Sequence, residues 1–166
     1  LGIKVNVMPI IKDSKGRMSS SRVRAALHHG DLQAAKELLN RPYNFRGIVI
    51  RGKGLGQKLG WPTANLQING RKFLPGEGVY AAWAYENHQN TKYRAIMNLG
   101  PQPTIDPSSP SSVEVHLLNQ KVELLGKELI IEPIEKIRTQ IKFPNIEDLI
   151  KQIEKDAKKA QYIFQN

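Results

Sequence analysis

The sequence has no cysteine among its 166 residues, and aromatic residues make up only 7% of it. Without cysteine the chain can have no disulfide framework, no thiolate zinc or iron–sulfur site and no cysteine nucleophile. The four histidines (His28, His29, His88 and His116) are scattered, and the two neighbours cannot share one helix face, so a histidine-based metal site is not expected. No apolar run approaches the roughly 20 residues that span a bilayer, so we expect a cytoplasmic protein with no membrane partner.

Positive charge is the most prominent compositional feature, with 25 lysines and arginines against 15 aspartates and glutamates and a net charge of +10. The excess is shared between residues 1–43 and 44–143, whereas acidic and basic residues balance in 144–166. No lysine- or arginine-rich run occurs, and aromatic residues are not interleaved with basic ones as a nucleic-acid stacking surface requires. The charge therefore favours anionic ligands, nucleotides included, without choosing among them.

Local signals predict a helical hairpin early in the chain and a longer helix late in it. The hydroxyls of residues 19–21 can cap a first helix, which Gly30 ends. Asp31 can cap a second helix, and Pro42 prevents its continuation. Asn145 can cap the late helix, whose apolar stripe we expect to lie against the rest of the domain. The residues of that stripe are Ile146, Leu149, Ile150, Ile153, Ala157 and Ala160.

Between these helices the pattern changes to short strands separated by turns. Six segments are rich in β-branched or aromatic residues: 44–51, 78–86, 92–98, 112–118, 121–125 and 128–136. No helix is expected between them, so the strands should pair antiparallel, and closure into a small barrel would remove the exposed edges. The predicted fold class is mainly β, an antiparallel barrel with a C-terminal helix and a short N-terminal helical hairpin.

The stretch 51–65, RGKGLGQKLGWPTAN, is the most informative in the chain. Its glycines at 52, 54, 56 and 60 allow close backbone approach, so successive N–H groups can form a concave anion site to which Lys53 and Lys58 can add charge. The stretch is not a Walker A loop, because Gly-Lys-Ser/Thr is absent and no helix is expected after it, and it lacks the spacing of a Rossmann fingerprint. On the glycines alone, a phosphate-binding loop and an ordinary flexible loop are equally well supported.

Two pairs of polar residues are spaced so that extended backbone places both members on one side. Thr63 and Asn65 carry neutral oxygens that suit Mg²⁺ bound together with substrate phosphates, and the alternative is a local turn in which both side chains bond the backbone. Glu114 and His116 alternate with apolar residues along the strand predicted at 112–118. A carboxylate on a rigid strand, facing away from the core, can serve as a general base, and the alternative is a solvated surface glutamate.

Taken together, these motifs resemble the riboflavin kinase module, which forms the C-terminal half of the bacterial bifunctional riboflavin kinase/FAD synthetase. The resemblance covers about residues 41–164. It rests on segments in the family's order: Gly52 to Gly60 with Pro-Thr-Ala-Asn at 62–65, Met-Asn-Leu-Gly-Pro-Gln-Pro-Thr at 97–104, Glu-Val-His-Leu at 114–117, and Ile137-Arg138 with Lys142-Phe143. Residues 18–24 also resemble the Ser-Ser-Thr/Ser-x-x-Arg motif at the end of that enzyme's adenylyltransferase domain.

The resemblance implies a six-stranded, Greek-key barrel that uses ATP and Mg²⁺ to phosphorylate the terminal ribityl hydroxyl of riboflavin, giving FMN and ADP. Carried over by position, Glu114 would be the catalytic base, and Thr63 and Asn65 would bind Mg²⁺. The nucleotide-binding residues would be Gly52, Gly54, Gly56, Lys58, Gly60, Thr63 and His116. The flavin-binding residues would be Asn98, Ser111 and Arg138, with the 101–112 loop and the 138–143 segment closing over the flavin.

The expected domain organisation is an adenylyltransferase remnant with linker helices over 1–40 and a kinase barrel over 41–166. The expected partners are ATP, riboflavin and the missing adenylyltransferase domain of a longer parent that would also convert FMN to FAD; no nucleic acid is expected. The alternative is a basic β-barrel that binds RNA or single-stranded DNA, and it rests on the net charge and the barrel topology alone.

Overall fold

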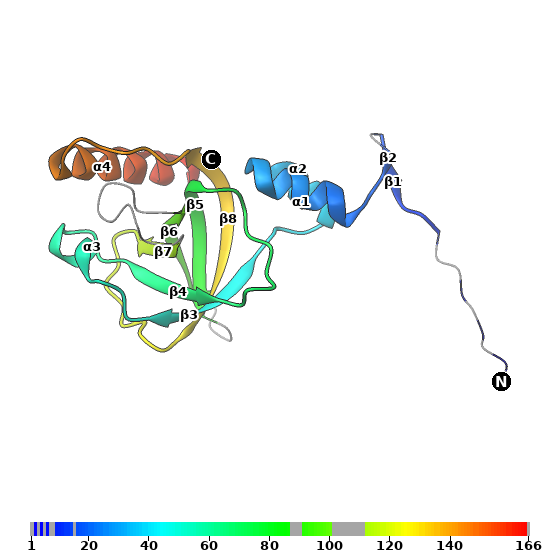
Figure 1. The fold of residues 1–166 in the computed structure, drawn as a ribbon, viewed down its shortest axis with the longest axis horizontal. Helices are drawn as coiled ribbons and strands as arrows, with labels where there is room; N and C mark the ends of the chain where they lie inside the picture. Colours follow the sequence, from blue (N-terminus) through cyan, green and yellow to red (C-terminus); the bar gives the residue numbers. More distant parts are fainter. Residues whose placement is uncertain are drawn as a thin grey trace.

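The computed structural model describes residues 2, 4, 6, 9–14, 16–86, 91–100 and 112–165, and every structural statement below concerns these residues. Figure 1 shows a β-barrel with one helix lying across it and a pair of helices at its side. The helices are α1 (Ser20–His29), α2 (Leu32–Leu39), α3 (Leu55–Lys58) and α4 (Ile146–Ile163). A two-stranded ladder of β1 (Lys12–Asp13) and β2 (Gly16–Arg17) precedes α1.

The predicted helical hairpin and late helix are confirmed, together with the capping residues that predicted them. Ser19 accepts a hydrogen bond from the backbone N–H of Arg22 at the start of α1, and Gly30 ends that helix with a left-handed φ of 74°. Asp31 caps α2 in the same way as Ser19 caps α1, and Asn145 Oδ1 accepts from the N–H of Asp148 at 2.8 Å at the start of α4. These contacts join residues three apart, which is why the sequence pattern revealed them.

Six strands close into the barrel, each antiparallel to its neighbours in the order β3-β4-β7-β6-β5-β8. Their bounds are β3 (Phe45–Ile50), β4 (Ala64–Ile68), β5 (Gly78–Glu86), β6 (Lys92–Gly100), β7 (Ser112–Leu117) and β8 (Glu128–Arg138). The barrel predicted from strand spacing and turn frequency is therefore confirmed.

One member of the predicted strand set is wrong, and one strand was missed. Residues 121–125 form a loop, not a strand, and the chain then turns where Lys127 donates to the carbonyl of Leu124. The side chain of Leu124 is buried in the barrel core and anchors this loop. The alternation of apolar and polar residues around it therefore comes from an anchored loop, not from a strand. The sixth strand is β4, in which only Leu66 is buried, so its hydrophobic signal is weak. The single helical turn α3 also lies between strands, where no helix was expected.

Successive side chains along the strands point to opposite faces of the barrel wall, and an apolar cluster forms on each face. The inner face contributes the larger cluster, which includes Phe45, Val49, Leu66, Tyr80, Ala82, Ala84, Ala95, Met97, Leu99, Val113, Val115, Leu117, Leu129 and Ile131. The outer face packs against α4 through a smaller cluster of Val79, Ala81, Ile96, Leu118, Ile137, Ala157 and Ala160. Because side chains alternate along a strand, residues between the inner ones point toward α4 wherever that helix covers the barrel.

The helical hairpin is packed onto the barrel. Leu27, Leu32 and Ala35 belong to the same apolar cluster as the barrel interior. The N–H of Gly76 donates to the carbonyl of Leu27 at 2.9 Å, and a Cβ at Gly76 would lie 2.0 Å from the carbonyl oxygen of His28. Burial raises the pKa of Tyr80 to about 12, so its hydroxyl stays protonated and donates to the carbonyl of Gly76.

Truncating Leu27 is therefore expected to destabilise the whole barrel. Its side chain is only 2% exposed, and Leu27→Ala should lower the free energy of unfolding by about 2–5 kcal/mol, as for other buried leucines. The matched control is Leu125→Ala, because Leu125 is 51% exposed and the same change there should alter stability by no more than about 0.5 kcal/mol. Urea unfolding measures both. A loss below about 1 kcal/mol at Leu27 would contradict the hairpin's place in the core.

Candidate active site

Four of the residues singled out from sequence lie in one row across the outer face of the barrel. Asn65 of β4 is paired with Glu114 of β7, which is paired in turn with Asn98 of β6. Asn98 is paired with Val79 of β5, and Val79 is paired with Arg138 of β8. Directly opposite residues of antiparallel strands point to the same face, so side chains from five consecutive strands share one surface.

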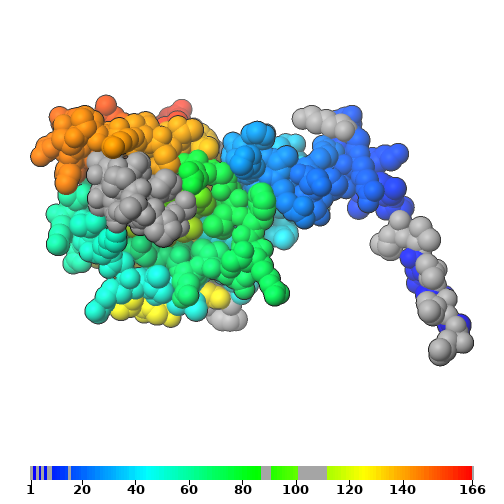
Figure 2. Space-filling model, viewed as in Figure 1, coloured from blue at the N-terminus to red at the C-terminus, as the bar shows by residue number. Residues whose placement is uncertain are grey.

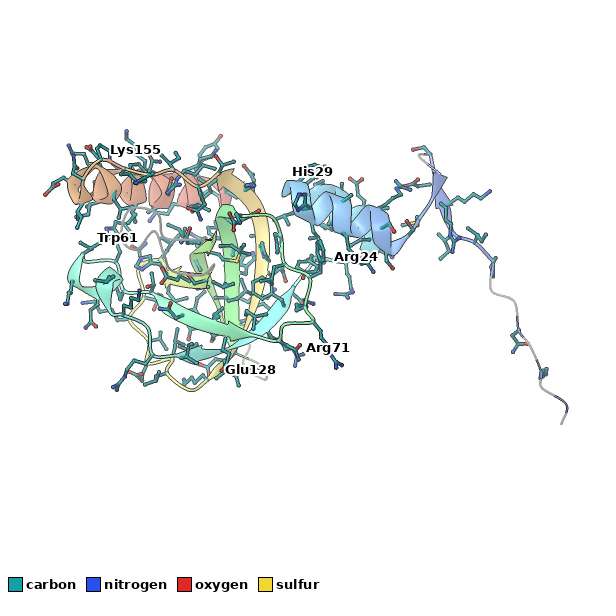
Figure 3. All side chains as sticks on the ribbon, in the orientation of Figure 1. Arg24, His29, Trp61, Arg71, Glu128 and Lys155 are labelled. Atoms are coloured by element: carbon teal, nitrogen blue, oxygen red, sulfur yellow. The ribbon has the colours of Figure 1, made fainter. Side chains whose placement is uncertain are left out.

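This row forms one wall of a cavity of about 440 Å³ beneath α4. All five residues of the row line it, together with the glycine-rich segment and the 138–143 segment. α4 and the segment before it contribute the apolar residues Ile141, Phe143, Leu149 and Ile153 to the lining. Figure 2 shows α4 along one edge of the barrel, and Figure 3 shows Trp61, another lining residue, below α4 and beside α3.

The glycine-rich segment folds back tightly onto Thr63 and Asn65. A Cβ at Gly52 would lie 2.1 Å from Asn65 Nδ2, and a Cβ at Gly56 would lie 2.3 Å from the carbonyl oxygen of Trp61 and 3.0 Å from Thr63 Oγ1. The N–H of Trp61 also donates to the carbonyl of Gly56 at 2.7 Å. These two glycines are therefore needed for close approach.

A second cavity, of about 690 Å³, adjoins the first on the other side of the glycine-rich segment. Gly52, Gly54, Thr63 and Asn65 line both cavities. Further lining of the second cavity comes from the rest of the segment 51–64 and from β3, β7 and the loop 120–125. Two ligands, one in each cavity, would therefore meet beside Thr63 and Asn65.

His116 holds the segment that leads into β4. Its Nδ1 lies 2.8 Å from the carbonyl oxygen of Pro62, and its ring meets that of Trp61 edge-on at a centroid distance of 5.0 Å. A carbonyl oxygen only accepts, so Nδ1 carries the proton in this contact. His116 therefore supports Pro62 and Trp61. It lines the first cavity and not the second.

Three residues singled out from sequence are not brought to the first cavity by the described structure. Lys58 is exposed at the end of α3 and lines neither cavity. Gly60 has a left-handed φ of 82° and lines only the second cavity. Ser111, like most of the predicted 101–112 loop, lies outside the described residues.

Sequence reasoning missed two residues that hold the row in place. Gln140 donates from Nε2 to Asn98 Oδ1 at 2.8 Å and to the carbonyl of Leu99 at 3.0 Å, and nothing in the sequence pattern indicated this. Asp156 of α4 binds Arg138, with an N–O distance of 2.8 Å. The sequence could have shown that Asp156 faces the barrel, because it is three residues after Ile153 and seven after Leu149 and so lies on the apolar stripe of the helix.

The described residues contain no cluster of three or more histidine, aspartate or glutamate side chains that could hold a metal ion. No described helix has the length and apolar character needed to cross a membrane.

Comparison with known proteins agrees with the motifs. A family model described as Flavokinase: Riboflavin kinase matches residues 39–164. Proteins named bifunctional riboflavin kinase/FMN adenylyltransferase are 40% identical in Bacillus subtilis, over 90% of this chain and 48% of the relative, and 39% identical in Haemophilus influenzae, over 89% of this chain and 47% of the relative. The chain thus spans about half the length of the curated relatives it matches.

Solved structures share the fold. A structure named Macrolide-efflux Protein from Streptococcus pneumoniae superposes with a TM-score of 0.81 at 30% identity, over 93% of this chain and 50% of that chain. Riboflavin kinase from Trypanosoma brucei superposes with a TM-score of 0.54 at 18% identity, over 75% of this chain and 81% of that chain, which shows a likeness of fold. Since the family model accounts for most of the sequence, the chain belongs to the riboflavin kinase family.

Proposed function

We propose that this chain transfers the γ-phosphoryl group of ATP to the terminal ribityl hydroxyl of riboflavin, giving FMN and ADP. The observation that carries the proposal is the meeting of two cavities at Thr63 and Asn65, with Glu114 directly beside Asn65 on the neighbouring strand. A reaction between two bound ligands needs such a junction, because most of the catalysis of phosphoryl transfer comes from positioning and charge stabilisation.

The first cavity suits a flavin in both length and chemistry. Three strand steps separate Glu114 from Arg138 along the row, which at about 4.8 Å per step is about 14 Å. A flavin ring can lie among Phe143, Leu149 and Ile153 near Arg138. Its ribityl chain then runs past Asn98 and brings the terminal hydroxyl to Glu114.

Glu114 is assigned as the base that accepts the proton of that hydroxyl. As the hydroxyl oxygen bonds to the γ-phosphorus, the bond from the γ-phosphorus to the oxygen bridging to the β-phosphate breaks, and ADP leaves with that electron pair. The proton goes to a Glu114 carboxylate oxygen. Glu114 lies between Asn65 and Asn98 on a rigid strand, which keeps the base in place through the transfer.

The donor set at the junction fits Mg²⁺ brought in with ATP. Thr63 and Asn65 offer a hydroxyl and an amide oxygen, and a Cβ at Gly52 or Gly56 would press on these two side chains. A cation with few protein ligands that keeps phosphate oxygens and waters is the usual state of Mg²⁺ in such sites. When bound, it supplies charge stabilisation for the phosphates. Thr63 and Asn65 orient it from the protein side.

The second cavity is assigned to the nucleotide. Gly52 and Gly54, which line both cavities, would lie over its phosphates, with Gly60 at the margin and His116 supporting Pro62. Gly56 lines only the first cavity, where it packs against Trp61 and Thr63. Lys58 has no role in this assignment, because it lines neither cavity.

We further propose that residues 1–40 are the end of an adenylyltransferase half with its linker helices, and that 41–166 are the kinase barrel. The motif at 18–24 and the length of the relatives support this division. A longer parent would then also convert FMN to FAD, which the chain as given would not.

Product analysis tests the function. The purified chain with riboflavin, ATP and Mg²⁺ should form FMN and ADP, and the same chain with FMN in place of riboflavin should form no FAD. Folded protein that forms no FMN would overturn the proposal. Oligonucleotide binding that weakens steeply with salt, in protein that makes no FMN, would instead favour the nucleic-acid alternative.

A further inference from the structure

The side of α4 that faces the barrel contains one buried acidic residue. Asp156 is 3% exposed, and its neighbours in the sequence of that face, Ala157 and Ala160, pack on the barrel wall. Both carboxylate oxygens of Asp156 accept hydrogen bonds from Arg138 Nε, at 2.9 and 3.1 Å, and one also accepts from Gln152 Nε2 at 2.8 Å. Asp156 and Arg138 both line the first cavity.

Stability alone is a poor explanation for this pair. Removing two charges from water costs about as much as their attraction returns, and well-packed apolar residues in place of a buried ion pair are often as stable or more stable. The side chains of Arg138 and Asp156 are only 15% and 4% exposed. A charged pair at the wall of a ligand cavity therefore calls for a role in that cavity.

The geometry of the guanidinium suggests that role. Nε and Nη2 of Arg138 face Asp156, and Nη1 donates to the carbonyl of Thr139 at 3.0 Å. These contacts fix the orientation of the planar guanidinium group. Its Cζ atom lies 5.8 Å from the ring centroid of Phe143. Asp156 compensates the positive charge of Arg138. The guanidinium can therefore donate hydrogen bonds to the carbonyl and nitrogen acceptors of a neutral ring, and it does not favour binding of an anion at the apolar end of the cavity.

We propose that Asp156 is a positioning residue, which acts through Arg138 to orient the donor that binds the ring end of the flavin. The proposal deepens the function proposed above and rests on it. It assigns to α4 a part in flavin recognition that is separate from the phosphoryl-transfer end, about 14 Å away along the row.

Asp156→Asn is the first test. It removes the charge but keeps the size, and Arg138 is then held less firmly. The Kd for riboflavin, measured by flavin fluorescence, and the KM for riboflavin should both rise about tenfold, as expected for one charge-assisted hydrogen-bond partner. The KM for ATP and kcat should stay within about twofold, since the other end of the row is untouched. Glu154→Gln removes the same charge from an exposed position of α4 and should change none of these values.

A second variant separates positioning from folding, because Asp156→Asn leaves Arg138 partly buried without its charge partner. In Arg138→Met/Asp156→Leu the pair is replaced by apolar residues, so the melting temperature should stay the same or rise while riboflavin binding weakens at least tenfold. The proposal is overturned if Asp156→Asn binds riboflavin like the wild type, if both KM values rise equally, or if the double variant melts lower but binds riboflavin normally. Wild-type protein that binds no riboflavin would overturn the proposed function itself.

Discussion

Glu114→Gln is expected to lower turnover by about two orders of magnitude or more, with riboflavin and ATP binding within a few-fold of the wild type. A primary hydroxyl is a poor nucleophile, and a positioned base typically contributes about 10²–10⁴-fold to such a step. Glutamine keeps the shape of the side chain but cannot accept the proton. The fold should survive, because Glu114 points away from the interior that Val113 and Val115 fill.

Single-turnover kinetics at saturating Mg²⁺ and ATP measures the effect on the transfer step itself. Glu135→Gln is the matched control, since Glu135 is an exposed strand residue of the same barrel and lines neither cavity. Thermal melts should show all three proteins equally folded. A Glu114→Gln protein that turns over like the wild type would refute the base assignment, and Glu114 would then be an ordinary glutamate at the cavity wall.

Asn65→Ala should raise the Mg²⁺ concentration needed for half-maximal rate by about tenfold or more, besides slowing turnover. Gly52→Ala should have a similar effect without changing any polar residue. The added Cβ would lie 2.1 Å from Asn65 Nδ2, so the amide has to move by about an ångström or more. A shift of that size at a reacting centre can lower the rate by about 10²-fold.

Gly70→Ala is the control for the glycine variant, because a Cβ there has nothing within 4 Å and should leave the rate unchanged. The measurement is the initial rate against Mg²⁺ concentration at several fixed ATP concentrations. If Asn65→Ala and Gly52→Ala slow turnover but leave the Mg²⁺ dependence unaltered, the cation-binding role of Asn65 is wrong, and the residue only shapes the cavity.

Helices α1, α2 and α4 were predictable because their signals are local. The contacts of Ser19, Asp31 and Asn145 that begin α1, α2 and α4 each involve a backbone N–H three residues later. Such contacts need no information from the rest of the chain. Strand assignment was less secure, because β4 buries only Leu66 and owes its place to pairing with β3 and β7. The loop 121–125, by contrast, has strand-like alternation but pairs with none of the described strands, and the side chain of Leu124 anchors it to the core.

The sequence pattern indicated several residues that line the cavities, but it did not indicate how they are arranged. Alternation along 112–118 was enough to put Glu114 and His116 on the face opposite Val113 and Val115, because a side chain's face depends only on its own strand. That Asn65, Glu114 and Arg138 share one row depends on the register of strands up to 73 residues apart in the sequence, and no local pattern encodes that register.

By itself the sequence determined where α1, α2 and α4 begin, the mainly β class and which residue types could carry phosphoryl transfer, since each depends on neighbours a few positions away. Only the tertiary structure decided that two cavities meet at Thr63 and Asn65, that His116 holds Pro62, and that α4 supplies Asp156 to Arg138. These contacts form when closure of the barrel and packing of α4 bring distant segments together, and their energies come from burial and pairing that no single segment contains.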